Sequence, residues 1–264
     1  MDLELTNKIV LVSGSTAGIG LAIASALAQE GATVIINGRS QERVSAAIEQ
    51  IKKTNADAKL QGVAADLSTQ VGADELFQQV PQVDILVNNL GIYEPKAFAD
   101  ISDDDWLKII EVNVLSGVRL SRHYLPLMLE KNWGRIIFVS SESAINIPVE
   151  MIHYGVTKTA QVALARGLAE LTVGSNVTVN SVLPGPTKSE GVESFVEGMA
   201  TSQGIDPTQV EQEFFQNTRP SSLIKRFATP EEVAALVTFV ASPLSSATNG
   251  AALRVDGGVV RSIL

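Results

Sequence analysis

The chain has no cysteine among its 264 residues, and this absence excludes several kinds of site at once. Disulfides, zinc sites built on cysteine and thiol nucleophiles all require that residue. Only two histidines are present, His123 and His153, so we expect no metal centre. A chain of this length needs no covalent cross-links, because it buries a large core on folding.

Basic residues are in the minority. The chain has 20 lysines and arginines against 29 aspartates and glutamates, which gives a net charge of −9. Proteins that bind nucleic acids usually carry the opposite balance, so we expect no nucleic-acid partner. An acidic surface that favours solubility is the plainer interpretation of this charge.

Long apolar runs are also lacking. No stretch of eighteen apolar residues occurs, so the sequence predicts no membrane-spanning helix and no membrane partner. The N-terminal segment Met1-Asp2-Leu3-Glu4-Leu5 is acidic and has neither the basic nor the apolar region of a signal peptide. We therefore expect a cytoplasmic protein.

What the sequence does contain is an alternation of short apolar runs and longer helical stretches. Near-continuous apolar runs are typical of parallel strands that are covered on both faces. Strands are predicted at residues 8–13, 33–37, 60–65, 84–88, 135–140, 177–183 and 252–255. Helices are predicted up to Gly31 and at residues 41–53, 104–131, 151–173 and from about 230, and Pro126 should kink or break the third. The sequence thus predicts an α/β fold: one doubly wound parallel sheet of about seven strands with helices on both faces, in a single domain over 1–264.

Residues 186–220 have a looser pattern that is rich in Ser, Glu, Gln and Gly. They lie between a predicted strand and the helix that starts near Pro230, and regular patterns resume on both sides. We therefore interpret them as an excursion of the same domain over the substrate, and not as a linker.

The first predicted strand runs directly into Gly14-Ser15-Thr16-Ala17-Gly18-Ile19-Gly20, and a helix follows. Glycines let the backbone turn sharply and approach an anion closely, and a helix N-terminus offers unpaired N–H groups to it. Strand, glycine turn and helix in this order indicate a dinucleotide site. A P-loop is excluded because no Lys-Ser/Thr pair follows the last glycine, and a hydrolase elbow because Thr16 replaces its serine.

The end of the second predicted strand indicates which dinucleotide is bound. An acidic residue there would accept the ribose hydroxyls of NAD, but the chain reads Asn37-Gly38-Arg39-Ser40. Arg39 can pair with a 2′-phosphate through charge-assisted hydrogen bonds. The sequence favours NADP(H) over NAD(H), with a solvated surface arginine as the plainer alternative for Arg39.

A second group of residues predicts acid–base chemistry. Tyr154 and Lys158 are four residues apart and share a helix face, so the ammonium should lower the pKa of the phenol. Such a tyrosine gives a proton to an alkoxide or takes one from an alcohol. Ser141 follows the fifth strand, where it should hold the substrate oxygen, and Ser140 is the alternative. Asn113 interrupts the long helix and should satisfy backbone groups there.

Together these motifs resemble the short-chain dehydrogenase/reductase family over essentially the whole chain. Residues 13–20 are similar to its T-G-x-x-x-G-I-G, and residues 88–91 (NNLG) to its N-N-A-G. Asn113, Ser141, Tyr154 and Lys158 are similar to its catalytic tetrad, with Ser141 at the family's usual thirteen residues before Tyr154. The departures are Ser13 for threonine, Leu90 for alanine, and Ala17 where many NADP-preferring members carry Lys or Arg.

The resemblance implies a Rossmann-type fold and hydride transfer between a nicotinamide and a carbonyl or secondary alcohol. Tyr154 would be the acid/base and Ser141 would orient the substrate. Lys158 would lower the tyrosine pKa and bind the nicotinamide ribose, and Asn113 would hold a water leading to Lys158. The implied cofactor contacts are Gly14, Ser15, Thr16, Gly18, Ile19, Gly20, Arg39, Asp66, Leu67, Asn88, Gly91, Tyr154, Lys158, Pro184, Gly185 and Thr187. The family also implies a homotetramer, or a dimer.

No motif names the small carbonyl or alcohol substrate. A 3-oxoacyl-thioester reductase is one interpretation, and a polyol, sugar-acid or hydroxysteroid-type dehydrogenase is another. Residues after Ser141, residues before Tyr154 and the 186–220 excursion should select among them. An alternative of a different class is a non-catalytic NADP-binding sensor or scaffold, against which the intact set of Ser141, Tyr154 and Lys158 argues.

Overall fold

A computed structural model describes residues 1–263, and its strands form one seven-stranded sheet in the order β3-β2-β1-β4-β5-β6-β7. All neighbouring strands are parallel. The strands are β1 Ile9–Val12, β2 Thr33–Gly38, β3 Lys59–Ala64, β4 Ile85–Asn88, β5 Gly134–Val139, β6 Val177–Pro184 and β7 Ala252–Val255. Each lies within one residue of its predicted bounds, so the predicted α/β fold is confirmed.

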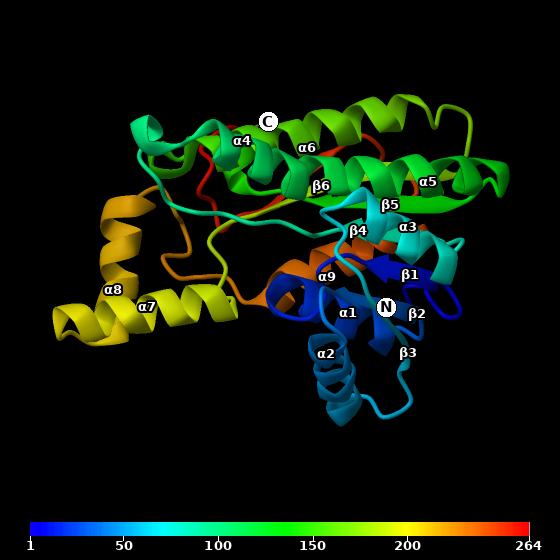
Figure 1. Ribbon diagram of the computed structural model, residues 1–264, viewed down its shortest axis with the longest axis horizontal. Coiled ribbons are helices and arrows are strands. Elements are labelled where there is room, and N and C mark those ends of the chain that lie inside the picture. Colours follow the sequence, from blue (N-terminus) through cyan, green and yellow to red (C-terminus); the bar gives the residue numbers. More distant parts are fainter. Residues whose placement is uncertain (264) are drawn as a thin grey trace.

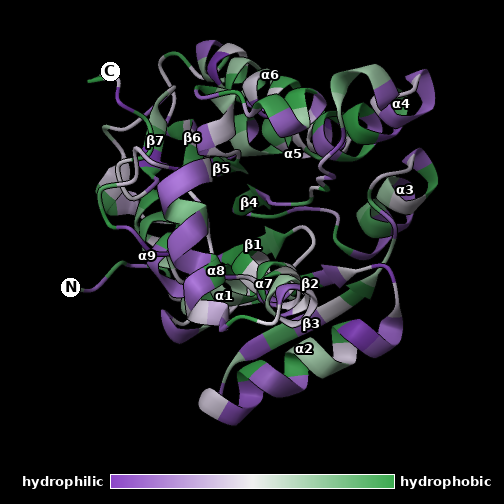
Figure 2. Cartoon of the chain, turned by 90° about the vertical axis from the view of Figure 1, so that its left-hand side faces the viewer, coloured by the Kyte–Doolittle hydropathy of each residue, from purple (hydrophilic) through white to green (hydrophobic). Residues whose placement is uncertain are grey.

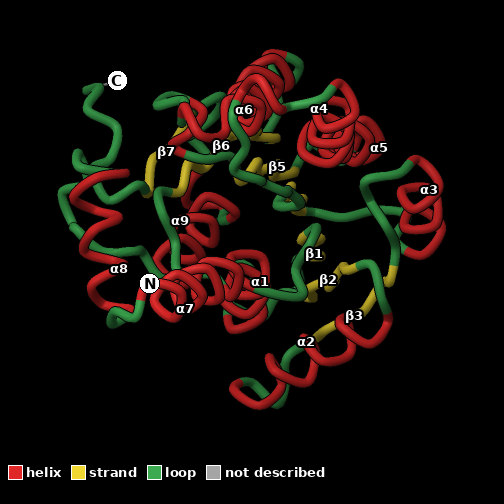
Figure 3. The backbone as a smooth tube through the Cα atoms, turned by 60° about the vertical axis from the view of Figure 1, so that its left-hand side comes forward, coloured by secondary structure: helices red, strands yellow, loops and turns green. Residues whose placement is uncertain are grey.

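Helices cover both faces of the sheet (Figures 1 and 3). One layer contains α1 Gly18–Gln29, α2 Gln41–Thr54 and α9 Pro230–Ala241. The other contains α3 Gln70–Gln79, α4 Asp103–Ile110, α5 Ser116–Glu130 and α6 Ile152–Glu170. The strand order reverses between β1 and β4, and ligands of such sheets bind in the crevice beyond the carboxyl ends of the strands at that point.

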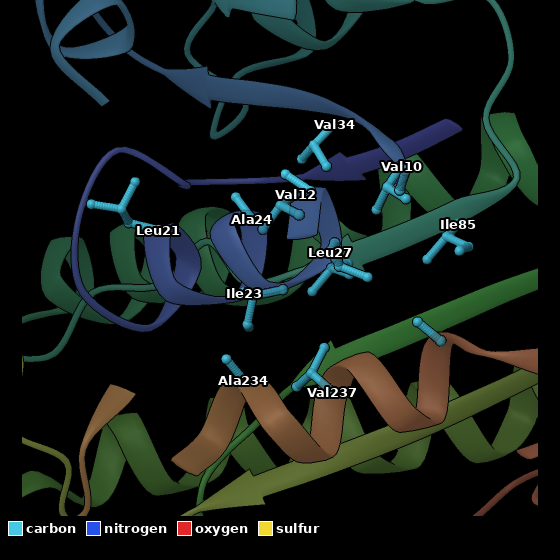
Figure 4. Close-up of a cluster of buried hydrophobic side chains, with 14 of the residues drawn as sticks. Val10, Val12, Leu21, Ile23, Ala24, Leu27, Val34, Ile85, Ala234 and Val237 are labelled. Atoms are coloured by element: carbon cyan, nitrogen blue, oxygen red, sulfur yellow. The ribbon is translucent and has the colours of Figure 1, made fainter. Parts of the chain in front are cut away.

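Alternate residues of each strand point into separate hydrophobic cores. Val10 and Val12 of β1 pack with Leu27 of α1 and Val237 of α9, in the cluster of Figure 4. Leu11 points to the opposite face, where it packs in the core under α5 and α6. Because both faces are covered, the central strands are mostly apolar, and β1 consists of the residues IVLV, which are hydrophobic in Figure 2.

The predicted helix at 104–131 is interrupted, but not by proline. Pro126 lies inside α5 and does not end it, so the predicted break at this residue is wrong. The interruption is a π-helical turn, η2 Glu111–Leu115, between α4 and α5. Turns of this kind are frequent at functional sites, and this one contains Asn113.

The 186–220 excursion is more regular than its sequence predicts. It contains α7 Glu190–Gln203, α8 Pro207–Glu213 and a π-helical turn, η5 Phe214–Thr218. Their apolar residues form a small core of their own with Phe227, so the segment is a packed helical unit. It starts at the carboxyl end of β6 and lies at the left of Figure 1.

The remaining elements are short. The 3₁₀ turns are η1 Phe98–Asp100, η3 Glu142–Ala144, η4 Val149–Met151 and η6 Pro243–Ser245. Helix α3 was not predicted from the sequence; Thr69 caps it by accepting a hydrogen bond from the Gly72 backbone N–H. Over residues 1–263, no helix combines the length and the apolar character needed to cross a bilayer.

Candidate active site

The glycine loop between β1 and α1 is held by side chains from two neighbouring strands. Asn37 at the end of β2 accepts a hydrogen bond from the Gly14 backbone N–H at 3.1 Å. The Ser15 hydroxyl is fully buried and donates to the carbonyl of Val12 at 2.7 Å. Ser15 therefore shapes the loop from within, and the loop backbone is left to meet a ligand.

Asn89, which follows β4, closes the loop from the other side. Its amide donates to the carbonyls of Ser13 and Gly14, both at 3.0 Å. A β-carbon at Gly20 would lie 2.4 Å from that amide nitrogen and 2.5 Å from the Gly14 oxygen. Only glycine fits at position 20, so the loop and the start of α1 approach each other closely enough to cradle a phosphate.

The N-terminus of α1 is available to an anion. Ala17 is its N-cap residue, and among the described residues no side chain caps the first turn. Gly18 and Ile19 begin the helix, so their backbone N–H groups are among those that lack intrahelical partners. The helix dipole adds a partial positive charge there, which suits a pyrophosphate.

Arg39 lies beside this loop. It directly follows β2 and is exposed. A β-carbon at the preceding Gly38 would lie 2.5 Å from the methyl group of Thr16, so the end of β2 packs against the glycine loop. Arg39 is thus placed next to the position at which the adenosine ribose of a dinucleotide would lie.

The other expected cofactor residues follow the carboxyl ends of the neighbouring strands. Asp66 and Leu67 follow β3, and the Asp66 carboxylate accepts hydrogen bonds from the Ser68 N–H and hydroxyl. Asn88 ends β4 and donates to Ser121, while its buried Oδ1 has no partner among the described residues. At β6, Pro184 is the last strand residue, Gly185 donates to the Val255 carbonyl, and the Thr187 hydroxyl donates to the Gly185 carbonyl.

The two serines after β5 have different partners. Ser140 donates to the backbone carbonyl of Lys158 at 2.8 Å, which ties β5 to α6. Ser141 bonds to the hydroxyl of Tyr154 and accepts a hydrogen bond from the Ser143 backbone N–H at 3.1 Å. Ser141 is therefore the serine that lies beside the tyrosine, and Ser140 is a structural partner.

Tyr154 differs from expectation in its ionisation. Burial raises the pKa of its hydroxyl to about 12, although the hydrogen bond from Ser141 lowers it and the nearby Glu142 carboxylate raises it. Lys158, whose Nζ lies over the ring 5.5 Å from its centre, does not contribute the expected lowering of the Tyr154 pKa. Burial also lowers the pKa of Lys158 to about 7. In this structure Tyr154 is a phenol at neutral pH, and therefore a proton donor.

Lys158 is held by a residue that the sequence did not indicate. Its Nζ donates to the Val139 carbonyl at 3.0 Å and to the Gln161 side-chain oxygen at 3.1 Å. The Gln161 amide donates in turn to the Asn113 backbone carbonyl at 2.5 Å. Gln161 thus links Asn113 to Lys158 through its side chain. In the sequence, the one indication of this contact was the position of Gln161, one helical turn after Lys158.

Asn113 has a structural role in the π-helical turn, as expected. Its fully buried side chain accepts from the Ile92 N–H at 2.8 Å, and donates to the Ile92 carbonyl and to Thr157. These bonds hold the segment after β4 against α6. As a result, a β-carbon at Gly91 would lie 3.4 Å from the Lys158 Nζ.

The glycine loop and the group of Ser141, Tyr154 and Lys158 therefore lie along one edge of the sheet. The loop and the N-terminus of α1 fit a pyrophosphate, and Lys158, which lies against Gly91, can donate to a ribose hydroxyl. The residues present thus fit a nicotinamide dinucleotide, with its reactive end at Ser141 and Tyr154.

A family model described as enoyl-(acyl carrier protein) reductase matches residues 14–260. The chain is 54% identical over 263 residues to the uncharacterized oxidoreductase YvaG of Bacillus subtilis, and the match covers all of both chains. The chain belongs to the short-chain dehydrogenase/reductase family. It is therefore an NAD(P)(H)-dependent oxidoreductase with a Rossmann-type fold.

The names of two further relatives of this dehydrogenase/reductase state their substrates. It is 35% identical to the 3-oxoacyl-(acyl-carrier-protein) reductase FabG of Aquifex aeolicus, over 98% of this chain and 100% of that one. The structure of L-sorbose reductase from Gluconobacter frateurii, complexed with NADPH and L-sorbose, superimposes with a TM-score of 0.94. The identity is 30%, and the match covers 100% of both chains.

The buried Lys158 makes the stability of this dehydrogenase/reductase depend on pH. Its pKa is about 7 when folded, below the ordinary 10.5 of the unfolded chain, so unfolding takes up a proton between these values. The Lys158 contribution to the free energy of unfolding should therefore rise as the pH rises from about 7 to 10.5. Thermal melting of the wild type and Lys158→Met across this range measures it, and the stability difference between them should change with pH. Replacement of the exposed Lys108 by Met is the control, and an equal slope for Lys158→Met and wild type would contradict the expectation.

Proposed function

We propose that the protein is an NADP(H)-dependent carbonyl reductase that interconverts a small ketone and its secondary alcohol. Tyr154 is the acid/base, Ser141 orients the substrate oxygen, Lys158 binds the nicotinamide ribose, and Asn113 fixes the segment that faces Lys158. The supporting observation is the convergence of Ser141, Tyr154 and Lys158 next to Gly91, at the sheet edge that also bears the glycine loop.

The protonation state of Tyr154 favours the direction of reduction. When bound, the reduced nicotinamide supplies a hydride to the carbonyl carbon. The negative charge that then develops on the substrate oxygen is met by the hydroxyl groups of Ser141 and Tyr154. Since burial holds the Tyr154 pKa at about 12, the tyrosine carries the proton that the oxygen needs at neutral pH.

For the substrate we propose a 3-oxoacyl thioester, which the relationship to the Aquifex reductase supports. A polyol or ketose is the second candidate, because the chain superimposes over its full length on a structure that holds L-sorbose. Rates of NADPH oxidation with acetoacetyl-CoA, L-sorbose and a 3-ketosteroid separate these classes. A clear rate with L-sorbose alone would replace the thioester proposal.

Arg39 is proposed as the anchor of the 2′-phosphate of NADP(H). A charge-assisted hydrogen bond contributes about 1.5–3 kcal/mol, so Arg39→Asp should weaken NADPH binding by about 10- to 100-fold. NADH binding should be retained, because it has no 2′-phosphate and the new carboxylate can accept its ribose hydroxyls. Titration of each protein with NADPH and NADH, followed by nicotinamide fluorescence, measures both affinities.

Lys52→Asp is the matched control for this titration. Lys52 lies in the last turn of α2 and its replacement makes the same change in net charge. It should leave the ratio of the two affinities as in the wild type. If Arg39→Asp and Lys52→Asp weaken NADPH binding equally, Arg39 is only a part of the general charge of the surface.

We also propose that the protein assembles into a homotetramer, or a dimer, through its long helices. Exposed apolar side chains on α4, α5 and α6, and at the end of α6, support this, namely Leu107, Ile110, Leu127, Val156 and Leu171. Sedimentation equilibrium of the purified protein tests it, and a monomer at micromolar concentration would refute it.

A further inference from the structure

A buried ion-pair network lies next to the catalytic residues and involves a residue of the 186–220 helical unit. Arg219 follows the π-helical turn at the end of that unit, and its side chain is 9% exposed. Its Nε donates to the carboxylate of Glu142 at 3.2 Å, and its Nη1 donates to the carboxylate of Glu150 at 3.1 Å. One guanidinium thus joins two acidic residues from the segment between β5 and α6.

These two acidic residues are adjacent to the catalytic groups along the chain. Glu142 directly follows Ser141 and forms the first residue of the turn that Ser141 caps. Glu150 lies in the turn that leads into α6, four residues before Tyr154. The Glu150 backbone carbonyl also accepts from the Lys96 N–H at 2.9 Å, which fixes that turn to the segment after β4. Arg219 therefore connects the helical unit to both sides of the Ser141–Tyr154 pair.

Glu142 is an unusual neighbour for a catalytic tyrosine because it is a buried carboxylate. Its Oε1 accepts from Arg219 and from the Ser143 hydroxyl, whereas the buried Oε2 has no partner among the described residues. Burial raises the pKa of Glu142, and the charge of Arg219 opposes this. Arg219 is the cation that compensates this carboxylate in the part of the chain that the structure describes.

The charged and titratable groups around Tyr154 come from several elements. Lys158 lies over its ring from α6, Glu142 faces it from η3, and the Tyr93 ring from the segment after β4 lies 6.1 Å away. The carboxylate of Glu142 and Tyr93 raise the pKa of the Tyr154 hydroxyl, and the hydrogen bond from Ser141 lowers it. Glu142 itself is faced by Arg219, by Ser143 and by the Asn146 side chain. A change at Arg219 therefore reaches Tyr154 through Glu142.

We propose that Arg219 is a positioning residue for the reaction: it fixes Glu142 and Glu150 on either side of the Ser141–Tyr154 pair and neutralises the carboxylate next to the tyrosine. The 186–220 unit thereby acts on the acid/base as well as covering the substrate. This inference rests on the proposed carbonyl reduction, because it assigns a position and a charge to the group that transfers the proton there.

The test uses three variants of the full chain: Arg219→Met, Glu142→Gln and the double variant that combines them. The measured quantity is the midpoint of the pH dependence of kcat/KM for alcohol oxidation by the complex with NADP⁺, which rises as the Tyr154 phenolate forms. The positive charge of the oxidised nicotinamide places this midpoint below the Tyr154 pKa of the cofactor-free protein. In Arg219→Met the uncompensated Glu142 charge should move the midpoint to higher pH, since Glu142 is ionised at alkaline pH. In Glu142→Gln it should move to lower pH, and in the double variant it should return to the wild-type position.

Misplacement of the catalytic groups should also lower kcat of Arg219→Met at pH 7 by about a hundredfold, with the dissociation constant of NADPH unchanged. If Arg219 only stabilised the fold, Arg219→Met would lower the melting temperature without moving the midpoint. The proposal is overturned if both single variants have the midpoint of the wild type. It is also overturned if the double variant has the same midpoint as Arg219→Met. If Arg219→Met does not fold, the Glu142→Gln variant, which keeps Arg219 paired with Glu150, decides by itself.

The failure of this inference is distinct from failure of the proposed function. If the wild type reduces none of the ketones tested, the proposed function has failed. If the wild type is active and the midpoints of the single variants coincide with that of the wild type, only the role of Arg219 is wrong.

Discussion

Replacement of Tyr154 by phenylalanine is expected to lower kcat for carbonyl reduction by about a thousandfold, which is typical for loss of a general acid. The ring and its place under Lys158 remain, so NADPH should bind as in the wild type. Steady-state kinetics and nicotinamide fluorescence measure the two effects separately. This variant also distinguishes an enzyme from a non-catalytic NADP sensor, because a sensor would keep its function without the hydroxyl.

Tyr93→Phe is the matched control for this experiment. The Tyr93 ring contacts the Tyr154 ring edge-on, but its hydroxyl faces Gly191 at the start of α7. Loss of that hydroxyl should leave kcat close to the wild-type value. Equal losses in the two variants would show that the site depends on general tyrosine packing, and the role given to Tyr154 would be wrong.

The second large effect is expected at Gly20. An alanine β-carbon there would lie 2.4 Å from the Asn89 amide nitrogen and 2.5 Å from the Gly14 carbonyl oxygen, so the backbone of the loop must shift. Overpacking of this kind costs about 1–3 kcal/mol of folding free energy. Because the same atoms shape the phosphate cradle, Gly20→Ala should also abolish measurable NADPH binding at micromolar concentration. Fluorescence titration and thermal melting measure the two losses.

Gly167→Ala provides the opposite result in the same assays. Gly167 lies in α6, and apart from its chain neighbours and the helix's own backbone, no described atom would come within 4 Å of its new β-carbon. Alanine inside a helix should therefore stabilise the protein by about 0.5–1 kcal/mol and leave NADPH binding unchanged. If Gly20→Ala binds NADPH as tightly as Gly167→Ala does, the glycine loop does not form the cradle.

The sequence predicted the sheet well because the strands between its two edges are buried on both faces. That burial makes the strands near-continuous apolar runs, which are easy to distinguish from polar helices. The helices of the 186–220 unit were harder to predict because their apolar residues pack in a small local core. The relevant signals were Val192 and Val196 at helical spacing, Gly204 in a left-handed conformation after α7, and Asp206-Pro207 at the start of α8.

The residues at the carboxyl edge of the sheet were predicted from motifs, but their partners were not. Asn89, Gln161 and Arg219 bind residues far from them in sequence, and no local pattern predicts such contacts. The ionisation of Tyr154 was predicted in the wrong direction for a related reason. Spacing along a helix places Lys158 near the ring, but burial, which dominates the pKa, depends on the whole fold.

The shared guanidinium of Arg219 has a consequence for how this protein diverges. Glu142 and Glu150 lie in the segment expected to select the substrate, and loss of Arg219 alone would leave the buried Glu142 carboxylate without its cation. A mutational path that replaces Arg219 therefore passes through a poorly active intermediate unless Glu142 changes first. We expect descendants of this sequence that lose Arg219 to have lost Glu142 as well, so that a shift in substrate is recorded at two distant positions at once.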